Sequence, residues 1–187
     1  MSAFLLALIA AAFATLAGRE AVRVGRLAGG LGAGVPLMAA IWASSLASAA
    51  LAGWLGGWLA AQLDPAGKAM LVALALALGA IQIVVLRTGR PPREPTRSFG
   101  AIVAVLFAAQ LTDPARLIVL ALAASSGAPW LAVAGGALGS GAALTVAAFA
   151  GPEWDSRVPL GALRWTAAAL LIMAALTIGL GARGLIG

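Results

Sequence analysis

Long apolar runs separated by short polar intervals make up almost the whole chain. Six of these runs approach the roughly 20 apolar residues that an α-helix needs to cross the hydrocarbon core of a bilayer. They cover residues 2–18, 35–60, 67–86, 99–124, 128–150 and 163–183. The pattern predicts six transmembrane helices and leaves almost no sequence for a soluble domain.

One long polar stretch, LRTGRPPREPTRSFG at residues 86–100, interrupts the apolar pattern. Its proline, arginine and threonine content is typical of a linker and cannot span a membrane. We therefore expect a first three-span unit at residues 1–86, a basic cytoplasmic linker at residues 87–98 and a second three-span unit at residues 99–187.

The two units align with each other without a gap when one is shifted by 94 positions. FATLAGRE at residues 13–20 then falls on FAAQLTDP at residues 107–114. Further coincidences are Gly57 with Gly151, Pro65 with Pro159, and Gly67 with Gly161. Because each unit has an odd number of spans, the two copies must lie in opposite orientations in the membrane. We therefore expect an all-α integral membrane protein of two inverted three-helix repeats, a plan common among secondary transporters that bind substrate near the midplane.

Composition supports a membrane location. Hydrophobic residues make up 63% of the 187 positions, and the mean hydropathy is +1.05, whereas soluble domains are roughly 45–50% apolar. The sequence contains no cysteine and no histidine, which excludes disulfides, thiolate zinc sites and imidazole chemistry. Any bound metal would be a hard, oxygen-preferring ion. No nucleophile–base pair or phosphate-binding loop is recognisable, so we do not expect an enzyme.

Basic residues are spread through the polar intervals and are not grouped with aromatic residues, so they indicate membrane topology and not nucleic-acid binding. With the N-terminus outside, the cytoplasmic side holds nine arginines, at positions 19, 23, 26, 87, 90, 93, 97, 157 and 164. The outside keeps Lys68 and Arg183, with Arg116 left open as a third. The positive-inside rule therefore predicts both termini outside, and we expect the protein in a bacterial inner membrane.

Two stretches rich in small residues fall at matching places in the two units. They are ASSLASAALAGWLGG at residues 43–57 and GGALGSGAALTVAAFAG at residues 135–151. Small side chains let helix backbones approach closely in lipid. We expect the glycine and serine residues of both stretches to serve helix packing and not binding.

Asp113 lies inside an apolar run that is otherwise able to cross the bilayer. An ionisable group at the bilayer centre costs about 2.5–3.5 kcal/mol on the insertion scale, and such groups face partners, cavities or substrate pathways. Pro114 directly after it removes a backbone donor and predicts a kink or break in the helix. Broken helices at the midplane expose carbonyl groups and helix ends to substrates. We therefore interpret Asp113 as a binding residue.

The chain resembles the Gdt family of calcium/manganese–proton antiporters, which is related to the LysE exporters. Members of that family have two inverted three-span halves. The first span of each half carries Glu-x-Gly-Asp-(Lys/Arg)-(Thr/Ser), usually after Phe-x-Ala. In the second copy of this chain Phe107, Ala109 and Asp113 match the motif. Gln110 replaces the glutamate and Thr112 the glycine.

The first copy departs further from the family motif. Gly18 matches, but Leu16 stands where the glutamate belongs. Arg19 stands where the aspartate belongs, and Glu20 where the basic residue belongs. The resemblance implies four carboxylates around a transported Ca²⁺ or Mn²⁺, and of these four the chain retains only the aspartate of the second copy.

The resemblance implies a binding site made of Asp113, Gln110, Thr112, Arg19 and Glu20, with Asp113 and Gln110 as the metal-ligating candidates. The inverted repeat would place Arg19 opposite Asp113. The two charges would then pair, and the site would be charge-swapped. The alternative is that Arg19 and Glu20 lie at the cytoplasmic interface, with their side chains extended into the headgroup region.

These observations favour an inner-membrane secondary transporter that exports a small cation coupled to protons, with Mn²⁺ or Ca²⁺ as the family default. A charge-swapped site would also suit an amino acid or another zwitterion. Loss of the motif acids would fit a transport-inactive membrane scaffold. The expected partners are the lipid bilayer and a small ion or solute. No resident cofactor is expected, and assembly as a homodimer is left open.

Overall fold

The computed structural model describes residues 2–86 and 98–185, and within these ranges the secondary structure is entirely helical. Residues 87–97 of the expected linker lie outside the described residues. The helices are α1 (Ser2–Ala17), α2 (Arg19–Leu31), α3 (Val35–Ala61), α4 (Pro65–Val85), α5 (Phe99–Leu111), α6 (Pro114–Ser126), α7 (Pro129–Ala150), the 3₁₀ turn η1 (Gly151–Glu153), α8 (Trp154–Arg157) and α9 (Leu160–Ala182).

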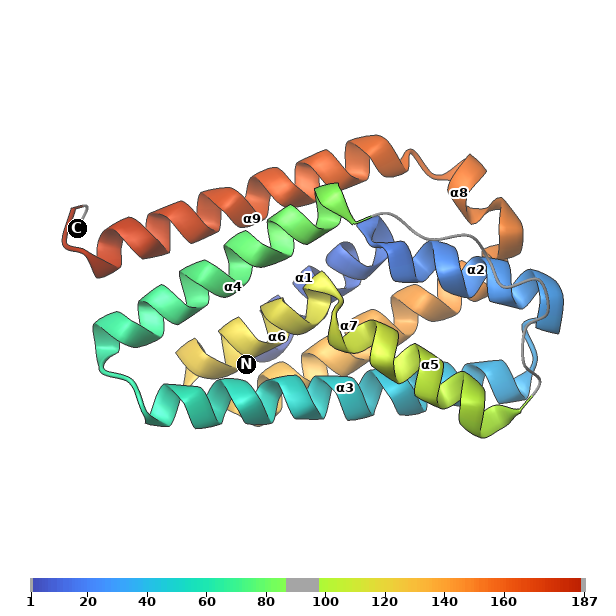
Figure 1. Cartoon of the computed structure of the whole chain (residues 1–187), viewed down its shortest axis with the longest axis horizontal. Coiled ribbons are helices and arrows are strands. Elements are labelled where there is room, and N and C mark those ends of the chain that lie inside the picture. Colours follow the sequence, from blue (N-terminus) through green and yellow to red (C-terminus); the bar gives the residue numbers. More distant parts are fainter. Residues whose placement is uncertain (1, 87–97, 186–187) are drawn as a thin grey trace.

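The helices form an elongated bundle in which α3, α4, α7 and α9 run along the long axis (Figure 1). These four helices are long and apolar enough to cross a membrane. Two further pairs pass the same test but are bent, α1 with α2 by 64° and α5 with α6 by 62°. The described residues therefore contain four candidate spans, or up to six if each bent pair is one span. The expectation of an all-helical protein with several apolar spans is confirmed.

The break between α5 and α6 occurs where the sequence predicts it. Thr112 and Asp113 leave the helical conformation, and Pro114 begins α6 as its first residue. Proline suits this position because it has no N–H to leave unbonded and its fixed φ matches a helix. The predicted span at residues 99–124 is therefore two short helices with an aspartate at their junction.

We expected a polar loop after the first span, and the structure shows that this prediction is wrong: a second helix follows the break after α1. Residues 19–31 form helix α2, in which Ala21, Val24 and Ala28 are buried, and this face packs against α7. Gly18 separates the two helices. At the end of α1, Nε of Arg164 in α9 donates a hydrogen bond to the carbonyl oxygen of Ala17, at 3.1 Å. This bond satisfies one of the carbonyl groups that every helix end leaves without a helical partner.

Close packing of α1 on α7 confirms the expected role of the small residues for two glycines. A Cβ built on Gly135 would collide with the carbonyl oxygen of Phe4, and one built on Gly139 would collide with the carbonyl oxygen of Leu8. Only glycine allows helices to approach this closely. Helix α7 therefore lies directly against α1, although the two belong to different halves of the chain.

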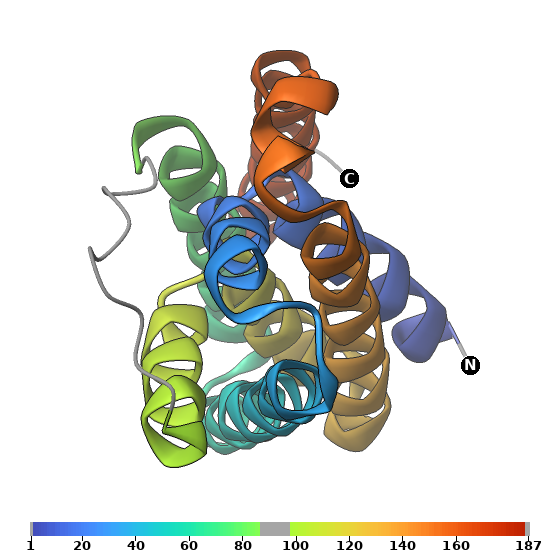
Figure 2. The same ribbon diagram turned by 90° about the vertical axis from the view of Figure 1, so that its right-hand side faces the viewer.

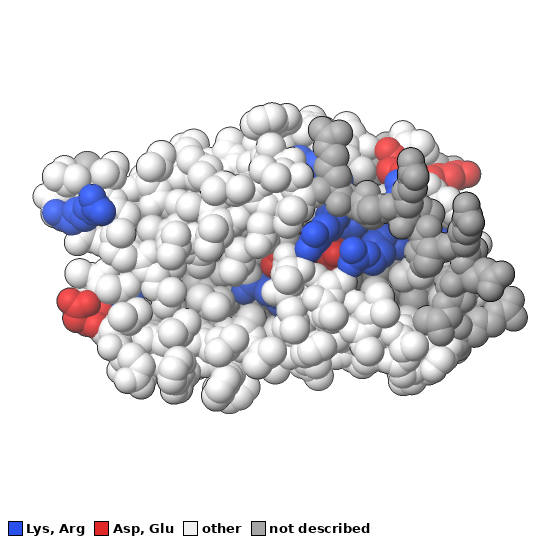
Figure 3. All heavy atoms as spheres, viewed as in Figure 1, with Lys and Arg blue, Asp and Glu red and all other residues white. Residues whose placement is uncertain are grey.

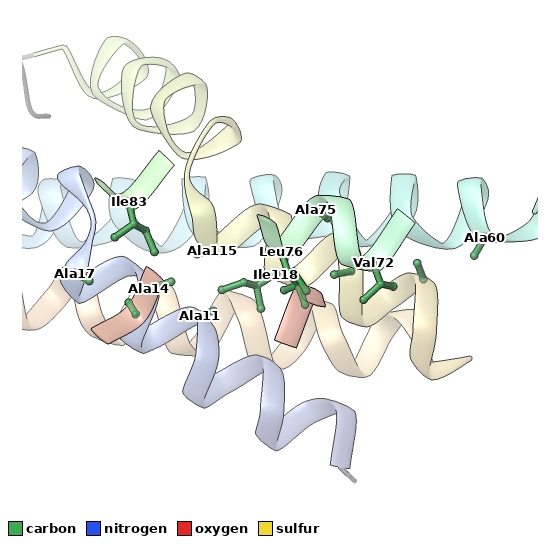
Figure 4. Packing of buried hydrophobic residues seen from close by; sticks show 14 residues of the cluster. Ala11, Ala14, Ala17, Ala60, Val72, Ala75, Leu76, Ile83, Ala115 and Ile118 are labelled. Carbon is green, nitrogen blue, oxygen red and sulfur yellow. The ribbon is translucent and has the colours of Figure 1, made fainter. Parts of the chain in front are cut away.

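The largest apolar cluster joins α1, α4, α6 and α9. Figure 4 shows Val72 and Leu76 of α4 beside Ile118 of α6, with Ala11 and Ala14 of α1 next to them. Most members are alanines, so the helices approach closely. Helix α9 lies at the edge of the bundle in Figure 2. The cluster thus holds the two bent pairs against the straight helices.

The surface of the described residues is largely apolar. In the view of Figure 3 most of the described face carries no charge, and the charged side chains gather at its ends and between its middle and α2. Large apolar side chains stand exposed along the bundle, among them Trp54, Trp130 and Trp165. An apolar surface of this extent indicates contact with lipid and not with water. The structure therefore supports a multi-pass membrane protein.

Candidate functional site

The two helix breaks lie against each other, although they are 94 residues apart in the sequence. Nη2 of Arg19, at the start of α2, donates a hydrogen bond to Oγ1 of Thr112 at 2.7 Å and contacts its carbonyl oxygen at 3.4 Å. A Cβ built on Gly18 would lie 3.3 Å from Oδ1 of Asp113. The residues that interrupt the first bent pair therefore lie against those that interrupt the second.

Asp113 is buried at this junction, with 1% of its surface exposed. It occupies the N-cap position of α6, but its side chain does not cap the helix. Its Oδ1 atom is buried and has no hydrogen-bond partner among the described residues. Buried polar atoms are almost always bonded, and a buried carboxylate oxygen without a partner is costly. An open acceptor of this kind is what a binding site for a cationic group requires.

Arg19 has partners other than the Asp113 carboxylate that we expected. Its Nε atom lies 3.4 Å from Oε1 of Glu20, and its Nη2 atom reaches Thr112. No ion pair of Asp113 occurs within the part of the chain that the structure describes. Arg19 therefore does not pair with Asp113 as expected. It bonds instead to Thr112, the residue before the aspartate.

Glu20 lies inside the bundle, and its side chain does not extend towards the surface as the alternative expected. Its side chain is fully buried. Nη1 of Arg23 donates to both of its carboxylate oxygens, each at 2.9 Å. Because Arg19 also approaches it, the negative charge of Glu20 is already compensated by two guanidinium groups.

Arg116 is the main residue of the site that the sequence analysis missed. We left it open as a residue of the outside, whereas the structure buries it with 2% of its surface exposed. Its Nε atom donates to Oγ of Ser48 at 2.8 Å. Its Nη2 atom donates to Oε1 of Gln110 at 2.6 Å and to Oγ of Ser140 at 3.0 Å. Its Nη1 atom is buried without a hydrogen-bond partner among the described residues.

Gln110 connects this network to α3. It is 1% exposed, and its Nε2 atom donates to Oγ of Ser44 at 2.8 Å. Its Oε1 atom accepts from Arg116 and lies 3.2 Å from Oγ of Ser48. The amide oxygen that we expected as a metal ligand is thus bonded to a guanidinium. The serines of α3 and α7, expected to serve packing alone, also hold this network.

All five residues expected from the sequence lie at the junction or in contact with it: Asp113, Gln110, Thr112, Arg19 and Glu20. Arg116 could have been found because it follows Asp113 by three residues inside an apolar run, and positions three apart share a helix face. Ser48 and Ser140 carry no such signal, because serine is common in packed membrane helices.

Among the described residues, side chains of the usual ligating types do not form a metal centre. Within residues 2–86 and 98–185 no group of three or more His, Cys, Asp or Glu residues could hold a metal ion. The junction offers a cation one open carboxylate, that of Asp113, with the hydroxyl and backbone oxygens of Thr112 beside it in the chain.

Comparison with known proteins identifies the second half of the chain. A family model described as the divalent cation/proton antiporter GDT1 matches residues 98–184, which include Asp113 and the helices from α5 to α9. The description is that of a transporter family and not of an enzyme class. Neither the curated proteins nor the solved structures yielded a match. The family match over residues 98–184 supports the resemblance to this family that the motif around Asp113 indicated.

Proposed function

We propose that the protein is a secondary transporter that moves a divalent cation across a membrane in exchange for protons. The substrate would bind where the two helix breaks meet. One observation carries this proposal above the rest: Asp113 is a buried carboxylate with an open oxygen at a break in an apolar helix pair. Non-helical backbone at membrane depth occurs where it is buried in protein or lines a cavity, and in transporters such breaks form the substrate site.

We further propose that the chain has six spans arranged as two inverted repeats. The offset of 94 positions found in the sequence recurs in the helices. Helix α1 ends at residue 17 and α5 at residue 111, and α3 begins at residue 35 and α7 at residue 129. The two bends differ by only 2°, at 64° and 62°. Helix α1 packs on α7 of the other half, and α5 packs in the same way on α3.

The family description favours a divalent cation, and we propose Mn²⁺ or Ca²⁺. Both ions prefer oxygen ligands. Asp113 supplies the open carboxylate, and the hydroxyl and carbonyl oxygens of Thr112 lie next to it in the chain. A carboxylate that binds the ion in one state and a proton in the other would couple the two movements. We propose a bacterial inner membrane as the location, with both termini outside.

A zwitterion such as an amino acid is the second candidate substrate, and one observation favours it. Asp113 has an open acceptor and Arg116, one helical turn later, has an open donor. An ammonium group could bind the first and a carboxylate the second, because guanidinium groups pair well with carboxylates.

Flux into proteoliposomes tests these proposals. The purified full-length chain is reconstituted, a proton gradient is imposed, and uptake of Mn²⁺, Ca²⁺ and a panel of amino acids is measured. Saturable uptake that depends on the gradient and is abolished by Asp113→Asn is expected. Asp155→Asn is the matched control, because Asp155 is exposed and pairs with Arg26, two helical turns after Arg19 on α2. Uptake of no substrate in the panel would contradict transport and favour a membrane scaffold.

A further inference from the structure

The guanidinium of Arg116 sits where a transported cation would find its oxygen ligands. We propose that Arg116 is a tethered cation that occupies an oxygen cage formed by Ser48, Gln110 and Ser140 and thereby excludes divalent ions from it. Divalent binding would then be confined to Asp113 and its immediate neighbours. The inference rests on the proposed function only in taking Asp113 as the acid that meets the substrate.

Oxygens from three separate helices converge on this one guanidinium. Ser48 belongs to α3, Gln110 to α5 and Ser140 to α7. Their oxygens accept from Arg116 at 2.8, 2.6 and 3.0 Å. Convergence of hydroxyl and amide oxygens from several elements is how proteins ligate hard cations. The cage is therefore suited to a cation, and a side chain of this protein supplies one.

The donors of the cage are already engaged, which leaves its oxygens free to accept. The hydroxyl of Ser48 donates to the carbonyl oxygen of Ser44 at 2.6 Å, and that of Ser140 donates to the carbonyl oxygen of Gly136 at 2.7 Å. The amide nitrogen of Gln110 donates to Ser44. With these hydrogens directed elsewhere, the lone pairs of the three oxygens face the guanidinium.

Arg116 also balances the charge of the junction. Glu20 is compensated by Arg19 and Arg23, so Asp113 and Arg116 are the remaining charges buried there. A guanidinium stays protonated in proteins, so Arg116 keeps its positive charge when a divalent ion approaches. A second, doubly charged cation in the same cage would be strongly repelled. Removing the guanidinium charge should therefore raise the affinity for Mn²⁺.

Mn²⁺ binding to the purified full-length chain tests this proposal without any gradient. Affinity is measured by calorimetry and by the electron paramagnetic resonance signal of free Mn²⁺. Arg116→Gln removes the charge but keeps a polar side chain, and we expect it to bind Mn²⁺ about tenfold more tightly or better. Arg116→Met, an unbranched apolar replacement, should show a gain in the same direction. Arg116→Lys keeps the charge and should show none. Adding Asp113→Asn to Arg116→Gln should abolish the gain.

Unchanged or weaker Mn²⁺ binding in a folded Arg116→Gln protein would overturn the proposal, as would an equal gain in Arg116→Lys. Folding is checked by size-exclusion chromatography and thermal unfolding. Loss of folding in both charge-free variants, with Arg116→Lys folded, would assign Arg116 a structural role and would also overturn it. A native chain that moves no cation in vesicles would contradict the proposed function but leave this comparison of affinities intact.

Discussion

At the scale of single residues, the two buried acids of the junction differ in what surrounds them. Both carboxylate oxygens of Glu20 accept from Arg23, whereas Oδ1 of Asp113 has no partner among the described residues. A carboxylate that is fully paired has no capacity left for a ligand, while an open one retains it. We therefore assign Glu20 to the stability of the junction and Asp113 to binding.

Stability measurements can test this assignment of Glu20. Glu20→Gln removes the charge that Arg19 and Arg23 compensate, and we expect a loss of about 2–3 kcal/mol in the free energy of unfolding. This lies below the ~3–5 kcal/mol typical of a broken buried pair, because the side chains of Arg19 and Arg23 are 18% and 31% exposed and can be solvated. Unfolding in detergent, followed by circular dichroism, measures the effect.

The exposed pair of Arg26 with Asp155 provides the control for that measurement. Its two atoms are 3.0 Å apart, but the side chains are 32% and 38% exposed. Exposed pairs contribute about 0–1 kcal/mol, so Asp155→Asn should cost little. Equal losses in Glu20→Gln and Asp155→Asn would contradict a stabilising role for the buried pair.

Much of the site could be predicted from single residues, but the buried guanidinium of Arg116 could not. An aspartate inside an apolar run is conspicuous, and the alignment of the two halves leads from it to Arg19 and Glu20. Arg116 was left open as a third basic residue of the outside, because the distribution of arginines was interpreted only as a sign of topology. Its burial depends on acceptors from Ser48 and Ser140, which lie on other helices. Tertiary contacts of this kind leave no local pattern in the sequence.

At the scale of elements, the two breaks were predictable to different degrees. Pro114 marks the start of α6 because proline cannot continue a helix from its preceding turn. Gly18 is a weaker signal, and the charged residues after it suggested a loop. The arginines at positions 19, 23 and 26 nevertheless recur at helical spacing, so their period, and not their charge, was the informative feature of α2.

Packing of α1 against α7 leads to a prediction about two helical glycines. A methyl group added at Gly139 would collide with the carbonyl oxygen of Leu8, whereas one added at Gly161 would meet no atom within 4 Å. Overpacking costs about 1–3 kcal/mol, so we expect Gly139→Ala to lower the unfolding temperature in detergent. Gly161→Ala should leave it unchanged or raise it slightly, because alanine favours helix. Equal effects of the two variants would show that the contact between α1 and α7 is not close.

At the scale of the whole molecule, the two bent pairs decide the topology. If each pair crosses the membrane, the chain has six spans, and the segments before α1 and after α4 lie on opposite sides. If each pair is re-entrant, the chain has four spans, and these two segments lie on the same side. The basic linker would then lie on the side of the N-terminus, and a cytoplasmic N-terminus would also satisfy the positive-inside rule, so the distribution of arginines does not distinguish the two topologies.

Cysteine accessibility distinguishes the two topologies, because the natural sequence contains no cysteine and single variants need no altered background. We introduce Ser2→Cys, Gln62→Cys, Thr96→Cys and Ser126→Cys separately and label intact cells with a membrane-impermeant maleimide. Six spans with the N-terminus outside predict labelling at positions 2, 62 and 126, and labelling at position 96 only after permeabilisation.

Two other outcomes would contradict six spans. If the first pair is re-entrant, positions 2 and 96 lie on the same side of the membrane and position 62 lies on the other side. A re-entrant second pair would place positions 96 and 126 on one side. Either result would remove the inverted repeat, because each repeat needs an odd number of crossings to reverse the orientation of its partner.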